Sequence, residues 1–192
     1  MTSAAHAPGH GWGRLLVAFL CGAAALGALI ALVGLSIVGF GLYDPTATTP
    51  HGPIASWAVH TTFIRGTQRA ARSTPTPSRF TAAQVGAGMK VYVARCELCH
   101  GGPATPRAAW VSAIDPTPPF LLDSARRWSP AELHLIIADG VKMTAMPAWR
   151  LTLDDGEIWD LVAFLESLPT TSPAHYGQAR AALTAPAPGD GR

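Results

Sequence analysis

Two cysteines and a histidine stand together at Cys96, Cys99 and His100, in the pattern Cys-x-x-Cys-His. Two thiols at this spacing can add to the vinyl groups of a porphyrin and form thioethers, while the adjacent imidazole binds the iron. The same residue types could instead form a thioredoxin-like redox pair or half of a zinc site. The motif alone therefore leaves three kinds of chemistry open.

The rest of the chain favours covalent haem. A zinc site would need further ligands, but the remaining cysteine, Cys21, lies in an apolar run and is expected to be a packing residue. A thioredoxin-like pair would need a βαβ pattern around it, and the sequence does not contain one.

A haem iron used for electron transfer commonly takes a methionine sulfur on its second face. Met143 and Met146 both lie in the segment 140–149, downstream of His100. Pro147 restricts the residue before it to extended conformations, which would stiffen the loop around Met146. Met146 is therefore the predicted ligand and Met143 the alternative, although methionines more often only fill core space.

Three segments together resemble a class I c-type cytochrome: Cys96–His100, the run 140–149 that ends in Met-Pro-Ala-Trp, and the apolar segment 157–165. The similarity extends from Phe80 to Pro169 and is greatest to membrane-anchored monohaem members, related to the cytochrome domains of alcohol dehydrogenases and cbb3-type oxidases. It implies an all-α fold around one covalently bound haem c, whose iron would be bound by His100 and Met146.

Composition fits one small domain. The chain has 192 residues and a formal net charge of +2, and its basic residues form no stripe interleaved with aromatic residues, so nucleic acid is not an expected partner. We expect a cytochrome domain at residues 80–170 and a flexible C-terminal tail at residues 171–192.

Residues 15–42 contain no charge and are long enough to cross the roughly 30 Å hydrocarbon core of a bilayer as an uncleaved helix. Because haem c is attached outside the bacterial plasma membrane, we expect a single-pass inner-membrane protein with residues 1–14 in the cytoplasm and the haem domain in the periplasm. Ala23, Gly27 and Ala31 share one face, so association with a membrane subunit is an open alternative.

Residues 43–79 should form a juxtamembrane linker that contains a helix from Pro53 to about Arg72. One predicted face carries the residues Ile54, Trp57, Thr61 and Ile64, and another the residues Arg65, Arg69 and Arg72. Such a helix could rest on lipid headgroups or on a partner, or could be a solvated linker.

Within the cytochrome domain, capping residues predict helices from Thr81 to about Arg95 and from Ser129 to about Asp139. A closing helix is expected from about Asp154 to Leu168, ending before Pro169. The resemblance implies that Gly86 or Gly88 lets the first and last helices cross closely, with the aromatic ring of Tyr92 packed beside the crossing.

Further cofactor contacts are predicted around the haem. Family members use a proline carbonyl as acceptor for the proximal histidine, and Pro118 is preferred here over Pro116. The side chains of Arg126, Arg127 or Trp128 could reach haem propionates. His134 is expected to be an exposed or packing residue.

Together these features predict a single-electron carrier and no enzyme, because two protein ligands leave no open site on the iron. The resemblance implies redox partners: a dehydrogenase on one side and a terminal oxidase or soluble cytochrome on the other. A fixed haem-bearing subunit of a respiratory or dehydrogenase complex is the alternative, whereas a haem peroxidase would normally need a second Cys-x-x-Cys-His motif.

Overall fold

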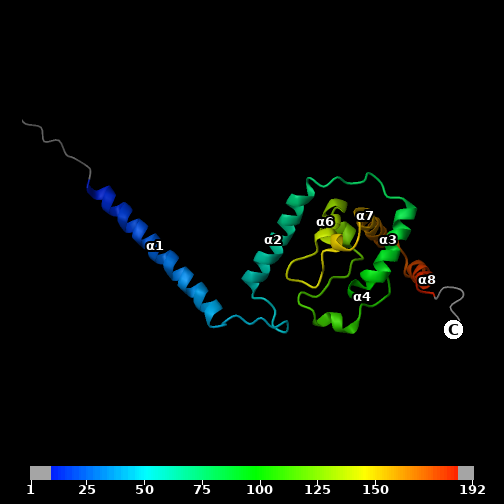
Figure 1. The fold of residues 1–192 in the computed structure, drawn as a ribbon, viewed down its shortest axis with the longest axis horizontal. Coiled ribbons are helices and arrows are strands. Elements are labelled where there is room, and N and C mark those ends of the chain that lie inside the picture. Colours follow the sequence, from blue (N-terminus) through cyan, green and yellow to red (C-terminus); the bar gives the residue numbers. More distant parts are fainter. Residues whose placement is uncertain (1–9, 186–192) are drawn as a thin grey trace, which may run out of the picture. The chain divides into compact units, whose positions relative to one another are not determined.

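The computed structural model describes residues 10–185 (Figure 1). Over these residues the chain is helical and contains no strand, only an isolated bridge between Gly102 and Thr105, so the all-α prediction is confirmed. The α-helices are α1 (His10–Gly39), α2 (Pro53–Ala71), α3 (Ala82–Arg95), α4 (Glu97–His100), α5 (Ser124–Arg127), α6 (Pro130–Asp139), α7 (Asp155–Ser167) and α8 (Pro173–Thr184). Three short 3₁₀ helices occupy Ala109–Ala113, Trp149–Leu151 and Leu168–Thr170.

The chain divides into two compact units, Met1–Thr49 and Pro50–Arg192. The described part of the first unit is mainly α1, and its stretch Gly11–Gly39 is long and apolar enough to cross a membrane. The helix ends three residues before the expected boundary at residue 42. Gly41 has a φ of +62°, and the amides of Leu42 and Gly41 donate to the carbonyls of Ile37 and Val38, which is a Schellman C-cap. Of the expected cytoplasmic segment 1–14, residues 1–9 lie outside the described part.

The second unit is built on the crossing of α3 and α7, which make its most extensive helix–helix contact. Gly88 lies at the crossing, where an added Cβ would come within 1.8 Å of the backbone oxygen of Asp160, whereas a Cβ at Gly86 would meet nothing within 4 Å. The ring of Tyr92, one turn further on, packs against Phe164 with 5.0 Å between centroids. Gly88 is therefore the residue that permits the close approach.

Helix α6 begins and ends as its sequence predicts. Ser129 caps it in a reciprocal box with Glu132, and Gly140 follows it with a φ of +65°. His134 of α6 is buried, stacks on Trp159 at 4.2 Å between ring centroids, and its Nε2 lies 2.8 Å from Asp155 Oδ1. It is thus a packing residue in the α6–α7 contact.

Helix α2 belongs to the same unit and packs against α6. The predicted apolar face of α2 is only partly right: Thr61 and Ile64 are half-buried, whereas Ile54 and Trp57 are exposed. Phe63, which was not assigned to that face, packs edge-on against Trp128 at 5.5 Å. The reason is that α6 is short and lies beside the second half of α2, as the residues lining the groove between them show.

The segment 171–192 was predicted to be a flexible tail, but it contains α8, which is capped by Ser172. The described part of the chain ends at Ala185. The expected tail residues 186–192 lie outside the described part. Tyr176 of α8 is fully buried, and an added Cβ at Gly102 would lie 2.5 Å from its ring. A single buried tyrosine in a weakly apolar segment gives little periodic signal, which is why the helix was missed.

Candidate functional site

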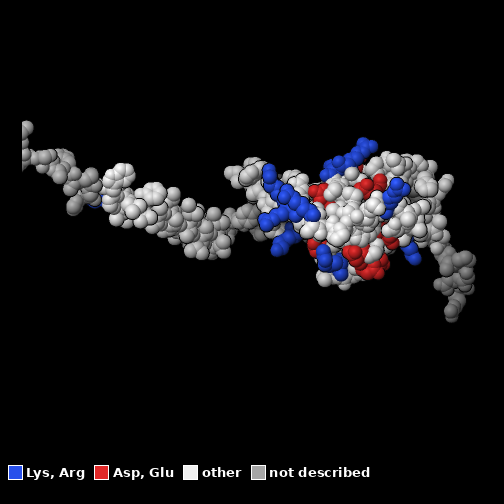
Figure 2. Space-filling view, turned by 90° about the horizontal axis from the view of Figure 1, so that it is seen from above, with Lys and Arg blue, Asp and Glu red and all other residues white. Residues whose placement is uncertain are grey.

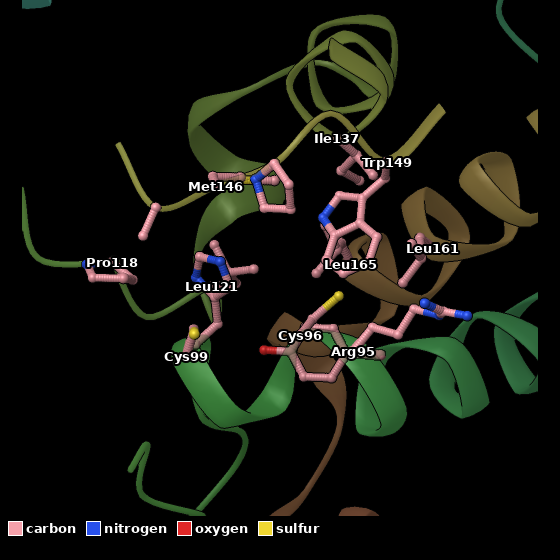
Figure 3. A pocket seen from close by; sticks show the side chains of 14 residues that line it. Arg95, Cys96, Cys99, Pro118, Leu121, Ile137, Met146, Trp149, Leu161 and Leu165 are labelled. Atoms are coloured by element: carbon pink, nitrogen blue, oxygen red, sulfur yellow. The ribbon is translucent and has the colours of Figure 1, made fainter. Parts of the chain in front are cut away.

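One cleft brings the predicted chemistry-bearing residues together (Figure 3). Cys96, Cys99 and His100 line it together with Met146, which is supplied by a segment more than forty residues later in the chain. The cleft is open to solvent and encloses a cavity of about 70 Å³. Most of its remaining lining is apolar, from Leu121, Ile137, Leu161 and Leu165.

The cysteine pair sits where α3 ends and the single turn α4 begins. Gly101 follows with a φ of +65°, and an added Cβ there would lie 2.8 Å from the backbone oxygen of Thr105. Glycine is needed at this position because the chain must reverse immediately after His100. Burial raises the pKa of the Cys96 thiol to about 12, so the free thiol is neutral near pH 7.

His100 is oriented by the chain itself. Its Nδ1–H donates to the carbonyl oxygen of Pro119 at 2.8 Å, which leaves Nε2 as the nitrogen available to a metal. The acceptor predicted from the sequence, Pro118, is wrong by one residue: its carbonyl accepts a hydrogen bond from Arg107 instead, although Pro118 does line the cleft. Burial lowers the pKa of His100, which favours the neutral ring that binds metals.

The two candidate methionines are in different environments. Met146 is half-buried against the core and lines the cleft, whereas Met143 is 69% exposed with a φ of +60°. Two hydrogen bonds hold the backbone of Met146. Its amide donates to Thr144 Oγ1 at 3.1 Å, and its carbonyl accepts from the Val141 amide at 3.2 Å. The geometry therefore favours Met146 over Met143 as the candidate iron ligand.

None of the three predicted propionate contacts, Arg126, Arg127 and Trp128, lines the cleft. Arg126 is solvent-exposed beside Asp123, with 3.8 Å between charged atoms, and Trp128 packs against Phe63 of α2. A different pair does line it, Arg95 and Trp149, with the guanidinium carbon 5.8 Å from the centre of the indole ring. Arg95 directly precedes Cys96, so adjacency to the motif was the signal that could have identified it.

A buried polar cluster behind the motif was also missed. Glu97, between the two cysteines, is 7% exposed and accepts from the Tyr176 hydroxyl at 2.6 Å and from Arg180 Nε at 2.8 Å. The Tyr92 hydroxyl donates to the Gly101 carbonyl at 2.6 Å from the other side. Helices α3 and α8 therefore both hold the segment that carries His100.

These residues fit a covalently bound haem. The donor set is two thiols, one imidazole with a defined tautomer and one thioether, in a cleft that is otherwise mainly aliphatic. No group of three or more His, Cys, Asp or Glu side chains suited to a bare metal ion occurs among residues 10–185. The site thus defines the class of c-type cytochromes.

Comparison with known proteins agrees with this class. Residues 83–165 match the family described as cytochrome c oxidase, cbb3-type, subunit III. This stretch runs from α3 to α7 and contains both cysteines of the motif together with His100 and Met146. No curated protein and no solved structure matches the chain. The match supports a cytochrome c domain in the second unit and, with it, a haem-based electron-transfer role.

Proposed function

We propose that the protein is a membrane-tethered electron-transfer cytochrome c of the bacterial periplasm, which carries one electron at a time on a single His/Met-ligated haem. The observation that carries the proposal is the convergence of Cys96, Cys99, His100 and Met146 on one cleft from two distant segments. Helix α1 would be the anchor, with its N-terminal end in the cytoplasm.

Each side chain has a separate role in this proposal. Cys96 and Cys99 form the two thioethers, His100 binds iron through Nε2, and Met146 binds it through sulfur. The haem supplies the one-electron redox chemistry. Arg95 and Trp149, in place of Arg126 and Trp128, are positioned to donate hydrogen bonds to its propionates.

If His100 and Met146 both bind the iron, no open site would remain on it, so the proposed role is transfer between proteins rather than catalysis. The partners would be a quinol- or substrate-oxidising dehydrogenase and a terminal oxidase or soluble cytochrome, through small transient interfaces. The family match favours a second candidate, a fixed haem-bearing subunit, because the matched family is named for an oxidase subunit. Purification in mild detergent distinguishes them: a carrier migrates alone, and a subunit migrates with a stoichiometric partner.

Covalent attachment is the direct test. Denatured protein should retain haem on a gel stained for peroxidase activity, and Cys96→Ser with Cys99→Ser should abolish the stain. Cys21→Ser is the matched control and should keep it, because Cys21 lies in α1. Release of the haem by acidic acetone from the unaltered protein would contradict the proposal.

Topology is tested separately. A C-terminal alkaline phosphatase fusion should be active, and a reporter that functions only in the cytoplasm should be silent at the same position. The opposite result would contradict a periplasmic haem domain.

A further inference from the structure

Helix α2 has two faces with different surroundings. Its inner face, with Phe63 and Thr67, is half-buried against the α6 region, and Phe63 contacts Trp128. At 3.6 residues per turn, Ile54, Arg65 and Arg72 lie within about 20° of the direction opposite Phe63. These outward residues are exposed. The helix is therefore fixed to the cytochrome domain by one side and open on the other.

The open face has one sign of charge. Arg65, Arg69 and Arg72 all project from it, and α2 contains no aspartate or glutamate. Figure 2 shows Lys and Arg side chains gathered where α2 lies in the molecule. An uncompensated cluster of arginines attracts an anionic surface.

The N-terminal end of α2 carries two large apolar side chains: Ile54 lies opposite Phe63, and Trp57 lies about 60° to one side of that direction. Ile54 is 81% exposed and Trp57 is 69% exposed, although the core of the unit lies a few turns away. Tryptophan with isoleucine beside a row of arginines is the composition of helices that lie in the headgroup region of a bilayer.

Chain connectivity places the surface of a membrane within reach. Thirteen residues, 40–52, separate the end of α1 from the start of α2, and an extended chain of that length spans at most about 45 Å. The end that is nearer to α1 in sequence is the one with Ile54 and Trp57.

We propose that the outward face of α2 binds the anionic surface of the membrane that α1 crosses, with Ile54 and Trp57 in the headgroup layer and the three arginines against lipid phosphates. This inference rests on the membrane anchor in the proposed function. Because α2 is packed on the domain, the contact would orient the whole haem domain instead of leaving it on a free tether. Helix α6 connects α2 to the site: Leu135 and Ile136 line the groove beside α2, and Ile137 lines the cleft.

Spin labels in the full-length haem-loaded protein test the contact. In a Cys21→Ser background, a nitroxide at Ala58→Cys, on the outward face, is compared in nanodiscs of phosphatidylcholine with and without phosphatidylglycerol. In the anionic discs we expect the label to lose accessibility to a water-soluble nickel complex and to gain accessibility to oxygen. Each arginine near an anionic surface raises the equilibrium constant for binding that surface about fivefold. The triple variant Arg65→Gln, Arg69→Gln, Arg72→Gln should therefore lower the ratio of membrane-bound to unbound α2 by roughly a hundredfold.

Two controls isolate the effect. Substitution of Arg79, Lys90 and Arg127 by Gln removes the same charge from outside α2 and should leave the Ala58 label protected. A label at Ala182→Cys on α8 should remain accessible to the nickel complex in both discs.

The outcomes separate this inference from the anchor. A label at Ala31→Cys reports α1 and should be buried in either disc. If the Ala31 label is buried but the Ala58 label is equally accessible in anionic and neutral discs, the membrane contact of α2 is overturned and the anchor stands. The same result is expected if α2 binds an acidic protein instead. If the Ala31 label is exposed to water, the anchor is contradicted and the α2 contact with it.

Discussion

The two segments that line the cleft are held in different ways. The cysteine segment, residues 96–101, receives hydrogen bonds from side chains of two helices: Tyr92 of α3, which directly precedes it, and Tyr176 and Arg180 of α8, which lies far along the chain. The methionine segment, residues 140–149, is held mainly by its own local bonds through Thr144 and Val141. The first is part of the folded core, whereas the second is a loop laid against it.

This difference separates two properties of the protein. Changes near the cysteine segment should alter global stability, because they disturb contacts between helices. Changes in the methionine segment should alter the ligation of the iron with little effect on the rest of the fold. The predictions below test that separation.

The largest effect is expected at the crossing that supports the cysteine segment. In Gly88→Ala the new Cβ would meet the Asp160 carbonyl, so α3 and α7 must separate, at a cost of about 3 kcal/mol or more in the free energy of unfolding. Gly86→Ala is the matched control on the same helix, with open space around it, and should stabilise by roughly 0.5–1 kcal/mol. Urea unfolding measures both; equal effects of the two substitutions would refute the close crossing.

Glu97→Gln should come next. The substitution keeps the size of the side chain but removes the buried charge that Arg180 pairs with. We therefore expect the free energy of unfolding to fall by about 1.5–3 kcal/mol and the backbone amides of α8 to exchange faster with solvent. The exposed pair of Arg126 and Asp123 provides the control, since Arg126→Gln should cost less than about 1 kcal/mol. A Glu97→Gln protein as stable as the Arg126→Gln protein would show that α8 does not brace the motif.

Thr144→Val tests the methionine segment. The substitution removes the hydroxyl that donates to the Val141 carbonyl and accepts from the Met146 amide. It should destabilise the loop conformation by about 1 kcal/mol without affecting the rest of the fold. We expect more carbon monoxide binding to the reduced iron with a nearly unchanged urea midpoint. Thr152→Val, which removes a longer, exposed hydrogen bond nearby, should change neither quantity. A large fall in the urea midpoint would place this segment in the core and remove the contrast.

Alkaline pH should weaken the cysteine segment slightly. Burial and the hydrogen bond to Glu97 raise the pKa of Tyr176 above its ordinary value of 10.0. The folded state thus keeps a proton that the unfolded state loses, so this stabilisation is complete below about pH 10 and is lost as the pH rises through the higher folded pKa. The free energy of unfolding should fall less steeply above pH 10 in Tyr176→Phe, as followed by chemical denaturation. Identical slopes would mean that Tyr176 titrates normally.

Local signals in the sequence predicted most of the helices. Ser129 forms the reciprocal cap that its sequence predicts, Thr81 is the N-cap that was expected, and Gly140 follows α6 with a positive φ. Reciprocal caps also form at Thr81 and Asp154, where none was predicted. Such motifs involve residues at most four positions apart, so they can be read without knowledge of the fold. The cysteine motif is recognisable for the same reason.

Contacts between distant segments could not be predicted in this way. Tyr176 and Arg180 meet Glu97 across about eighty residues, and no local pattern marks them as partners. The acceptor of His100 was misplaced by one residue because the competing bond from Arg107 to Pro118 depends on the tertiary fold. Arg126 was chosen for its charge, whereas Arg95 lines the cleft because of where α3 ends.

The far-red charge-transfer band of the ferric protein tests the central assignment most directly. This band reports methionine sulfur bound to haem iron. Met146→Ala should abolish it, lower the reduction potential and open the reduced iron to carbon monoxide, because Met146 lines the cleft. Met143→Ala should leave all three nearly unchanged, because Met143 is exposed. Loss of the band in Met143→Ala but not in Met146→Ala would contradict the account.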